Sequence, residues 1–144
     1  MIVGERILEV SGKKEPGATI KGLSINISLE DVKNTSSGQL EITYVYTANY
    51  DDNVGQIKIK GQLTAKEEDK LAREIGENWA KNKKFPDSYA ETVLSSVNYS
   101  GMANGTLLAR VLGLSAPLIP PKIQMPKAPV AAAPAPAAPK PGRK

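Results

Sequence analysis

The chain of 144 residues contains no histidine and no cysteine. Their absence excludes disulfides, zinc fingers, thiol nucleophiles and Ser-His-Asp triads, and it removes the usual transition-metal ligands. Carboxylates, lysines and tyrosines remain available for acid–base chemistry. Because the sequence shows neither paired carboxylates at a recognisable spacing nor a cofactor motif, we expect a protein that is not an enzyme and that binds no metal or cofactor.

Aromatic residues and long apolar runs are also scarce. Aromatics make up 5% of the chain, with one Phe and one Trp, and no run reaches the roughly 18 apolar residues that a membrane span needs. The first ten residues carry Glu5, Arg6 and Glu9 and lack the uninterrupted apolar core of a signal peptide. These absences predict a cytoplasmic protein that does not insert into a membrane.

The net charge of +4 belongs entirely to the C-terminal end. Residues 1–125 hold 15 basic and 15 acidic side chains, and this neutral balance argues against a nucleic-acid-binding face on the body. Residues 126–144 are rich in Pro and Ala, which is typical of a disordered, semi-rigid arm. The arm has no acidic residue and four basic ones: Lys127, Lys140, Arg143 and Lys144. The sequence therefore predicts a folded domain at 1–125 and a disordered basic tail at 126–144.

Three stretches of the body alternate apolar and polar residues. Residues 23–32, 39–50 and 56–64 show a period of two, which gives a strand one apolar and one polar face. A short first strand is predicted at 5–10. Residues 51–55, rich in Asp, Asn and Gly, predict the turn of an antiparallel hairpin between the last two strands.

Two helical stretches follow the strands. Residues 64–67 match a capping box, and an apolar stripe of Leu71, Ile75 and Trp79 continues the first helix. A second helix is predicted over 86–112. Because a sheet with one apolar face needs a cover, we expect an α+β fold in which two C-terminal helices pack on one face of an antiparallel four-stranded sheet.

Gly101 and Gly105 interrupt the second helix, and Ala109 follows at the same spacing. Each glycine costs about 1 kcal/mol relative to alanine inside a helix, so a compensating benefit is expected. The strip of small residues allows a second backbone to come close. Two alternatives remain open from the sequence: close packing against this chain's own sheet, or an oligomer contact between helices of two subunits.

Three further groups have both a structural and a functional interpretation. The row of Tyr44, Tyr46 and Tyr50 is predicted to be core, and the alternative is a stacking surface for a peptide or a base. Trp79 is predicted to lie in the core or at a subunit contact rather than on a ligand platform. The basic cluster between the helices is either a solvated helix end or a contact for RNA or an acidic partner; it comprises Lys81, Lys83 and Lys84.

The segment after the second helix contains three prolines among apolar residues over 115–125. Proline excludes helix and favours an extended path. Because its apolar side chains include Leu118, Ile119 and Ile123, we expect this segment to dock on the body.

The order of these elements resembles the SecB export-chaperone fold, including its archaeal SecB-like relatives. The local match is best in the strand pair Gln-Leu-Glu-Ile-Thr-Tyr-Val-Tyr at 39–46 and Val-Gly-Gln-Ile-Lys-Ile-Lys-Gly at 54–61. It is also seen where Phe85-Pro86 opens a long helix that ends in the Leu- and Pro-rich segment 114–123. The resemblance covers roughly residues 5–125 and omits the tail.

The resemblance implies an ATP-independent holdase that binds unfolded or nascent polypeptides in apolar grooves. It also implies a homo-oligomer, either a tetramer built as a dimer of dimers or a dimer. SecB proteins are acidic and engage a SecA-type motor ATPase partly through that surface, whereas this body is neutral. By position in the fold, the resemblance assigns peptide binding to Ile20, Leu23, Trp79, Phe85, Ile119 and Ile123. The alternative is a ribosome-associated or structural RNA-binding protein that acts through the basic tail.

Overall fold

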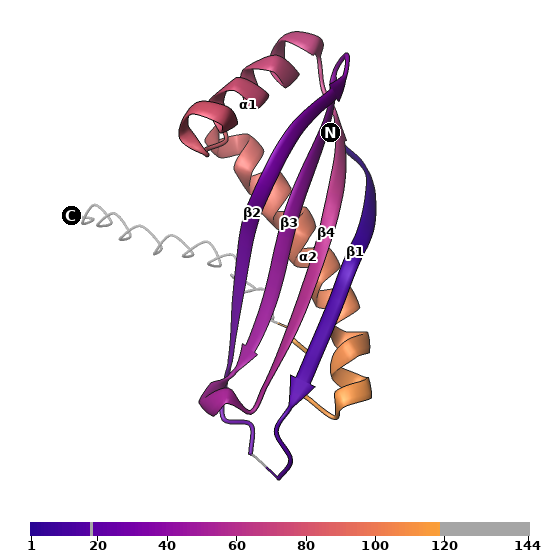
Figure 1. The fold of residues 1–144 in the computed structure, drawn as a ribbon, viewed down its shortest axis with the longest axis vertical. Coiled ribbons are helices and arrows are strands. Elements are labelled where there is room, and N and C mark those ends of the chain that lie inside the picture. The colour runs from indigo at the N-terminus through magenta and orange to yellow at the C-terminus, as the bar shows by residue number, and fades with distance from the viewer. Residues whose placement is uncertain (18, 119–144) are drawn as a thin grey trace, which may run out of the picture.

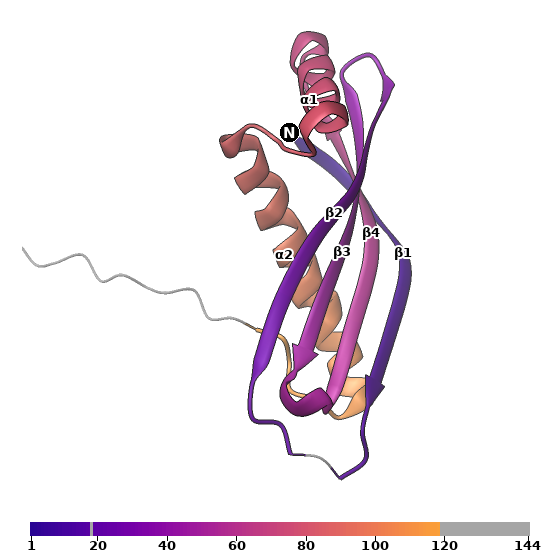
Figure 2. The same cartoon turned by 60° about the vertical axis from the view of Figure 1, so that its left-hand side comes forward.

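A computed structural model describes residues 1–17 and 19–118 of the chain (Figure 1). Four strands come first and two helices follow, as the sequence predicts. The elements are β1 (Ile2–Lys14), β2 (Leu23–Ser36), β3 (Gln39–Tyr50), β4 (Gly55–Lys66), α1 (Asp69–Asn82) and α2 (Asp87–Leu112), with a short 3-10 turn at Asp51–Asn53. Figure 2 shows both helices on the same side of the twisted sheet. The predicted α+β architecture is therefore confirmed.

The four strands form one antiparallel sheet in the order β1-β4-β3-β2. Both β1 and β2 are edge strands, and the connection at 15–22 carries the chain past the β3–β4 turn from one edge to the other (Figure 1). β3 and β4 form the centre, and their turn lies at the end of the sheet where β1 finishes and β2 begins. The predicted β3–β4 hairpin and the long connection after the first strand are both present.

The core lies between the two central strands and the helices. The inward side chains of β3 and β4 are only 0–2% exposed; they are Leu40, Ile42, Tyr44, Tyr46, Ala48 and Tyr50 on β3, and Ile57, Ile59, Leu63 and Ala65 on β4. Their polar neighbours in sequence point to the opposite face of the sheet. The tyrosine row is thus core, which settles the choice between core and stacking surface.

The boundary between β4 and α1 differs from the sequence prediction. Thr64 pairs with Glu41 in the ladder, and the fully buried Ala65 pairs with Leu40. The backbone N–H of Glu67 is taken by the carbonyl oxygen of Gly38, at 2.7 Å. The helix begins later, at Asp69, without a side-chain cap. The capping box expected at 64–67 is absent because strand pairing holds these residues.

α2 comes close to the sheet where its side chains are smallest. A Cβ atom at Gly101 would lie 2.2 Å from Cδ2 of Tyr46, and one at Gly105 would lie 2.8 Å from Cγ of Pro117. Gly101, Gly105 and Ala109 are all buried within this one chain. The small-residue strip therefore packs against the chain's own sheet. The oligomer contact predicted at these three residues is corrected accordingly, because the strip has no surface left for a second subunit.

The chain beyond α2 returns to the body. Gly113 ends the helix in the left-handed conformation, with φ of 63°, as a glycine at this position favours. Leu114 and Pro117 are buried, and the hydroxyl of Tyr50 donates a hydrogen bond to the carbonyl oxygen of Ser115. The docking expected for this segment is therefore seen at Pro117, whereas Leu118, which was also expected to dock, is 57% exposed. The rest of the predicted docking segment and the tail lie outside them; among the predicted site residues these are Ile119, Ile123, Lys127, Lys140, Arg143 and Lys144.

Neither helix of the described part of the chain is long and apolar enough to cross a membrane.

Candidate polypeptide-binding surface

The inward face of β2 is only partly covered by the helices. Leu23, Ile25, Ile27 and Leu29 alternate along this strand and are only half-buried, whereas the matching row of β3 is fully buried. Figure 1 shows the reason: α2 crosses behind the sheet obliquely, from the β2 side near α1 to the β1 side at the opposite end. The helix layer therefore leaves apolar surface uncovered on the first half of β2. We call these four residues the β2 row.

The backbone of β2 adds a second feature to the same surface. β2 pairs with β3 on one side only, because it is the last strand of the sheet. A strand at an edge presents unpaired N–H and C=O groups, which can hydrogen-bond to an extended polypeptide. The β2 row and the open edge of β2 together offer apolar side chains and backbone groups along one strand of 14 residues.

An aromatic cluster lies at the junction of the two helices. The ring centroids of Trp79 and Phe85 are 5.1 Å apart, and Tyr89 meets Phe85 edge-on at 5.3 Å. The ammonium of Lys83 lies 5.4 Å from the Trp79 ring centroid, in a cation–π contact. Lys83 reaches this position because it ends α1 in the left-handed conformation, with φ of 54°. The junction therefore combines aromatic surface with positive charge.

Two polar atoms of this aromatic cluster are buried without a partner. Within the described residues, the indole nitrogen of Trp79 and the hydroxyl of Tyr89 make no hydrogen bond. Burial raises the pKa of the Tyr89 hydroxyl, so the group stays protonated at neutral pH. Both atoms are therefore donors that the described part of the fold leaves unused.

The structure arranges the predicted peptide-binding residues in two groups along β2. Ile20 and Leu23 are half-buried at the start of the strand, where Leu23 pairs with Tyr50. Trp79 is buried and Phe85 is half-buried at the helix junction, and α1 packs on β2.

Three residues that connect these groups are not among the predicted site residues. Ile25, Ile27 and Leu29 lie between them on β2. Their alternation predicts a strand, but no local pattern indicates that β2 is an edge strand left partly uncovered.

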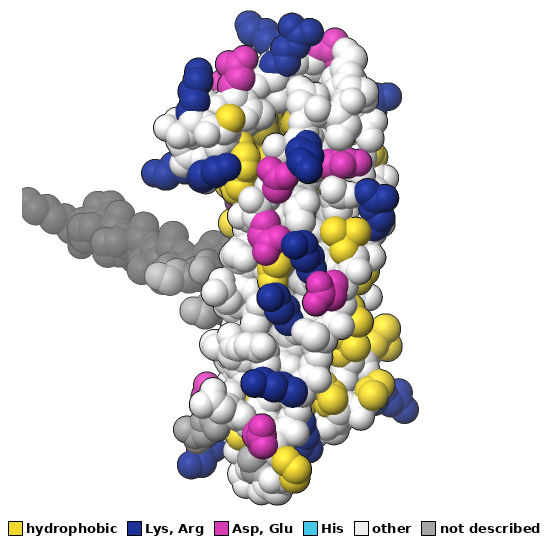
Figure 3. Space-filling model, in the orientation of Figure 1, with side chains coloured by type: hydrophobic (Ala, Val, Ile, Leu, Met, Phe, Trp, Pro, Cys, Tyr) yellow, Lys and Arg dark blue, Asp and Glu magenta, His cyan; other side chains and the backbone are white. Residues whose placement is uncertain are grey.

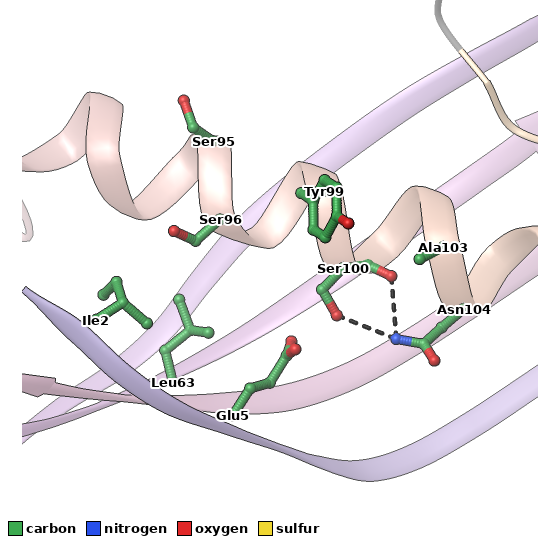
Figure 4. A pocket seen from close by; sticks show the side chains of 9 residues that line it. All are labelled: Ile2, Glu5, Leu63, Ser95, Ser96, Tyr99, Ser100, Ala103 and Asn104. Atoms are coloured by element: carbon green, nitrogen blue, oxygen red, sulfur yellow. Dashed lines mark hydrogen bonds between the residues drawn. The ribbon is translucent and has the colours of Figure 1, made fainter.

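A second partly uncovered surface lies between β1 and α2 (Figure 4). A cavity of about 480 Å³ opens there, with apolar walls that include Ile2 and Leu63. The Glu5 carboxylate accepts a hydrogen bond from the Tyr44 hydroxyl at its floor, and the Asn104 amide donates to Oγ of Ser100 at 3.1 Å. Burial, followed by the hydrogen bond with Glu5, raises the pKa of Tyr44.

Exposed apolar side chains continue this second surface along α2. Tyr99, Leu107 and Val111 recur at intervals of four or eight residues and are 75%, 66% and 84% exposed. Ile7 and Val10 of β1 are exposed as well. Figure 3, which looks onto the polar face of the sheet, shows hydrophobic side chains gathered along the β1 edge. We call this surface the β1–α2 face.

The electrostatics of the remaining surface are mixed. On the polar face of the sheet, Lys60 pairs with Glu30 at 2.7 Å, and positive and negative side chains alternate (Figure 3). No group of three or more Asp or Glu side chains within residues 1–17 and 19–118 could hold a metal ion.

The comparison with solved structures found a fold relative. The SecB-like chaperone Rv1957 of Mycobacterium tuberculosis, in complex with a ChAD peptide from the HigA1 antitoxin Rv1956, superimposes with a TM-score of 0.57 and 13% sequence identity. The match covers 82% of this chain and 85% of that one. At this identity the likeness shows the fold, which is SecB-like, and it does not single out the archaeal relatives. No protein-family model matches the chain, and the sequence comparison with curated proteins gave no match either.

Proposed function

We propose that this protein is an ATP-independent chaperone that holds unfolded or nascent polypeptides against the β2 row and the open edge of β2. The observation that carries the proposal is the contrast within one sheet, where the inward row of β3 is fully buried and that of β2 is half-buried. The SecB-like fold supports it, since the fold relative is a chaperone bound to a peptide.

The energetics of such a surface suit a holdase. Covering the exposed part of one such Leu or Ile side chain contributes up to about 1 kcal/mol, and each new backbone hydrogen bond contributes about 1 kcal/mol. A client that covers the β2 row and pairs with its edge thus gains several kcal/mol from groups that every polypeptide carries. The interaction needs apolar residues and a free backbone, so it is selective for unfolded chains without requiring one sequence.

We further propose that the protein works in the cytoplasm as a homo-oligomer, a dimer or a tetramer, assembled through the β1–α2 face. Tyr99, Leu107 and Val111 are the strongly exposed apolar residues of α2 there, and large exposed apolar patches mark contact surfaces. This assignment leaves the β2 row of each subunit free for client. A role for the basic tail in binding RNA has no supporting observation among the described residues, and we do not propose it.

Light scattering together with an aggregation assay tests the proposal. The protein, mixed at stoichiometric ratio with a chemically unfolded client and without nucleotide, should suppress light scatter from client aggregation. The mass of the soluble complex should equal that of the oligomer plus client. Aggregation at the same rate with and without the protein, for several unrelated clients, would refute the holdase function.

A further inference from the structure

A cavity of about 690 Å³ lies on the C-terminal half of α1, outside the β2 row. It is lined by two asparagines, two charged residues and the two residues that precede α2: Glu74, Asn78, Asn82, Lys84, Phe85 and Pro86. Among residues 1–17 and 19–118, none of its four polar side chains has a hydrogen-bond or ion-pair partner. Asn78 is nevertheless half-buried. A half-buried amide that the described part of the protein leaves unused is suited to bind a ligand.

The spacing of the two asparagines matches an extended polypeptide. Asn78 and Asn82 are four residues apart on one helix, so they share a face and are separated by about 6 Å along the axis. An extended chain repeats every two residues, or about 6.6 Å. Each amide side chain carries both donors and an acceptor and can pair with the N–H and C=O of one residue of an extended chain, because these two groups point to the same side. Two consecutive repeats of an extended segment can therefore pair with the two asparagines.

The wall next to the asparagines is aromatic. Phe85 is half-buried, and its ring contacts the rings of both Trp79 and Tyr89. These contacts hold the Phe85 ring in place. An apolar side chain of the bound segment can therefore pack on the ring without the entropy cost of immobilising it. The cavity thus has polar groups spaced for a backbone beside an apolar position for a side chain.

The two charged residues mark opposite ends of the cavity. Glu74 lies one helical turn before Asn78, and Lys84 follows Asn82, beyond the end of α1. Lys84 has no ion pair in the described part of the chain, and neither of its neighbours Lys81 and Lys83 forms one. Figure 3 shows the dark blue side chains gathered around the end of α1 that leads into α2. Charge complementarity therefore favours a carboxylate at the Lys84 end.

We propose that this cavity is a second polypeptide site that binds an extended segment in which an acidic side chain lies beside an apolar one. The asparagines pair with the backbone N–H and C=O of alternate residues, Phe85 receives the apolar side chain and Lys84 the carboxylate. The inference rests on the proposed function and specifies it further: clients with acidic residues flanking their apolar segments bind better than clients with basic ones.

Fluorescence anisotropy with two end-blocked peptides tests the assignment on the full-length protein. Both peptides carry the same Leu-Val-Leu-Val core, flanked by glutamates in one and by lysines in the other. Low salt should give about threefold tighter binding of the glutamate peptide, in keeping with one exposed ion pair. Asn78→Ala and Asn82→Ala should each weaken both peptides about fivefold, as expected for lost backbone hydrogen bonds. Lys84→Ala should abolish the preference between the peptides.

Matched variants separate this site from general effects. Lys81→Ala removes a neighbouring lysine that does not line the cavity, and Asn26→Ala removes an exposed asparagine from the polar side of β2; both should bind like the unchanged protein. If the asparagine variants bind both peptides with unchanged affinity, or Lys84→Ala keeps the preference, the second site is refuted.

The two proposals fail in different ways. Unchanged peptide affinity of the Asn78→Ala and Asn82→Ala variants, in a protein that still suppresses client aggregation, would refute the second site alone. Failure to suppress the aggregation of any client would instead refute the holdase function.

Discussion

The ring of Tyr46 on β3 lies directly beneath Gly101 of α2, where an added Cβ would come within 2.2 Å of Cδ2 of that ring. No alanine fits there without movement of the tyrosine or the helix, and neither can move freely because Tyr46 is fully buried. We therefore expect Gly101→Ala to lower the free energy of unfolding by about 1–3 kcal/mol, the usual cost of overpacking. Denaturant titration followed by circular dichroism measures the change.

A second glycine of the helix layer provides the control for this substitution. A Cβ at Gly76 of α1 would meet nothing within 4 Å. Gly76→Ala should therefore raise the free energy of unfolding by about 0.5–1 kcal/mol, because alanine favours helix and nothing opposes it. Equal effects of the two substitutions would contradict close packing at Gly101.

The buried tyrosines predict a loss of stability at alkaline pH. Burial, with a smaller contribution from Tyr50, raises the pKa of Tyr46 from 10.0 to about 12. The folded state thus keeps its proton where the unfolded state has lost it. The contribution of Tyr46 to stability is complete below pH 10 and is lost as the pH rises toward 12. In this window each such tyrosine lowers the free energy of unfolding by about 1.4 kcal/mol per pH unit, which urea titrations at several pH values measure.

Tyr46→Phe checks that assignment. The Tyr46 hydroxyl is buried without a partner in the described part of the chain, so its removal should reduce the alkaline slope and raise stability at pH 7 by about 1 kcal/mol. Tyr50→Phe also removes a buried hydroxyl but loses its bond to the carbonyl of Ser115, and should lower stability by about 1 kcal/mol. Stabilisation by both changes, or by neither, would contradict the difference in hydrogen bonding.

If the oligomer assembles through the β1–α2 face, its mass should depend on the exposed apolar side chains of that face. Leu107→Asp combined with Val111→Asp places two charges on this face, at side chains that are 66% and 84% exposed in one subunit. The mass from light scattering should fall to that of the monomer, with circular dichroism unchanged. Asn26→Asp combined with Ser28→Asp adds the same charge on the polar side of β2 and should leave the mass unchanged. A monomeric mass of the unchanged protein would itself refute assembly.

The sequence predicted those features that depend on local periodicity. The alternation at Tyr44 and Tyr46 predicted which residues of β3 are core, and the end of the second helix at residue 112 was predicted as well. The tertiary arrangement was beyond such patterns. The sequence around Thr64 is compatible with both a capping box and a strand. In the structure Thr64 pairs with Glu41, so it belongs to the strand. From the sequence, Gly101 could contact either the chain's own sheet or a second subunit.

The candidate site was predictable only in part, because it also depends on the tertiary arrangement. Ile25 and Ile27 follow the same pattern of alternation as the inward residues of β3, so no local signal distinguishes a covered row from an uncovered one. Their exposure depends on the strand order and on the oblique path of α2 across the sheet. Asn78 and Asn82 have a helical spacing that could be read from the sequence, but only the fold shows that they lack partners within the described part of the chain.

The β2 row predicts a loss of client holding that is independent of folding. Ile25→Asp and Ile27→Asp place carboxylates at half-buried positions of an edge strand. The carboxylates can still reach water in the free protein, so the fold is kept, but they would have to be desolvated against an apolar client. We expect at least about a tenfold loss of client affinity, from lost apolar burial and desolvation of the new charge. Aggregation suppression across protein-to-client ratios measures this loss, and the thermal unfolding of each variant shows that the fold is kept.

Asn26→Asp and Ser28→Asp, on the other face of the same strand, should suppress aggregation like the unchanged protein. Full suppression by folded Ile25→Asp and Ile27→Asp variants would place client binding on another surface.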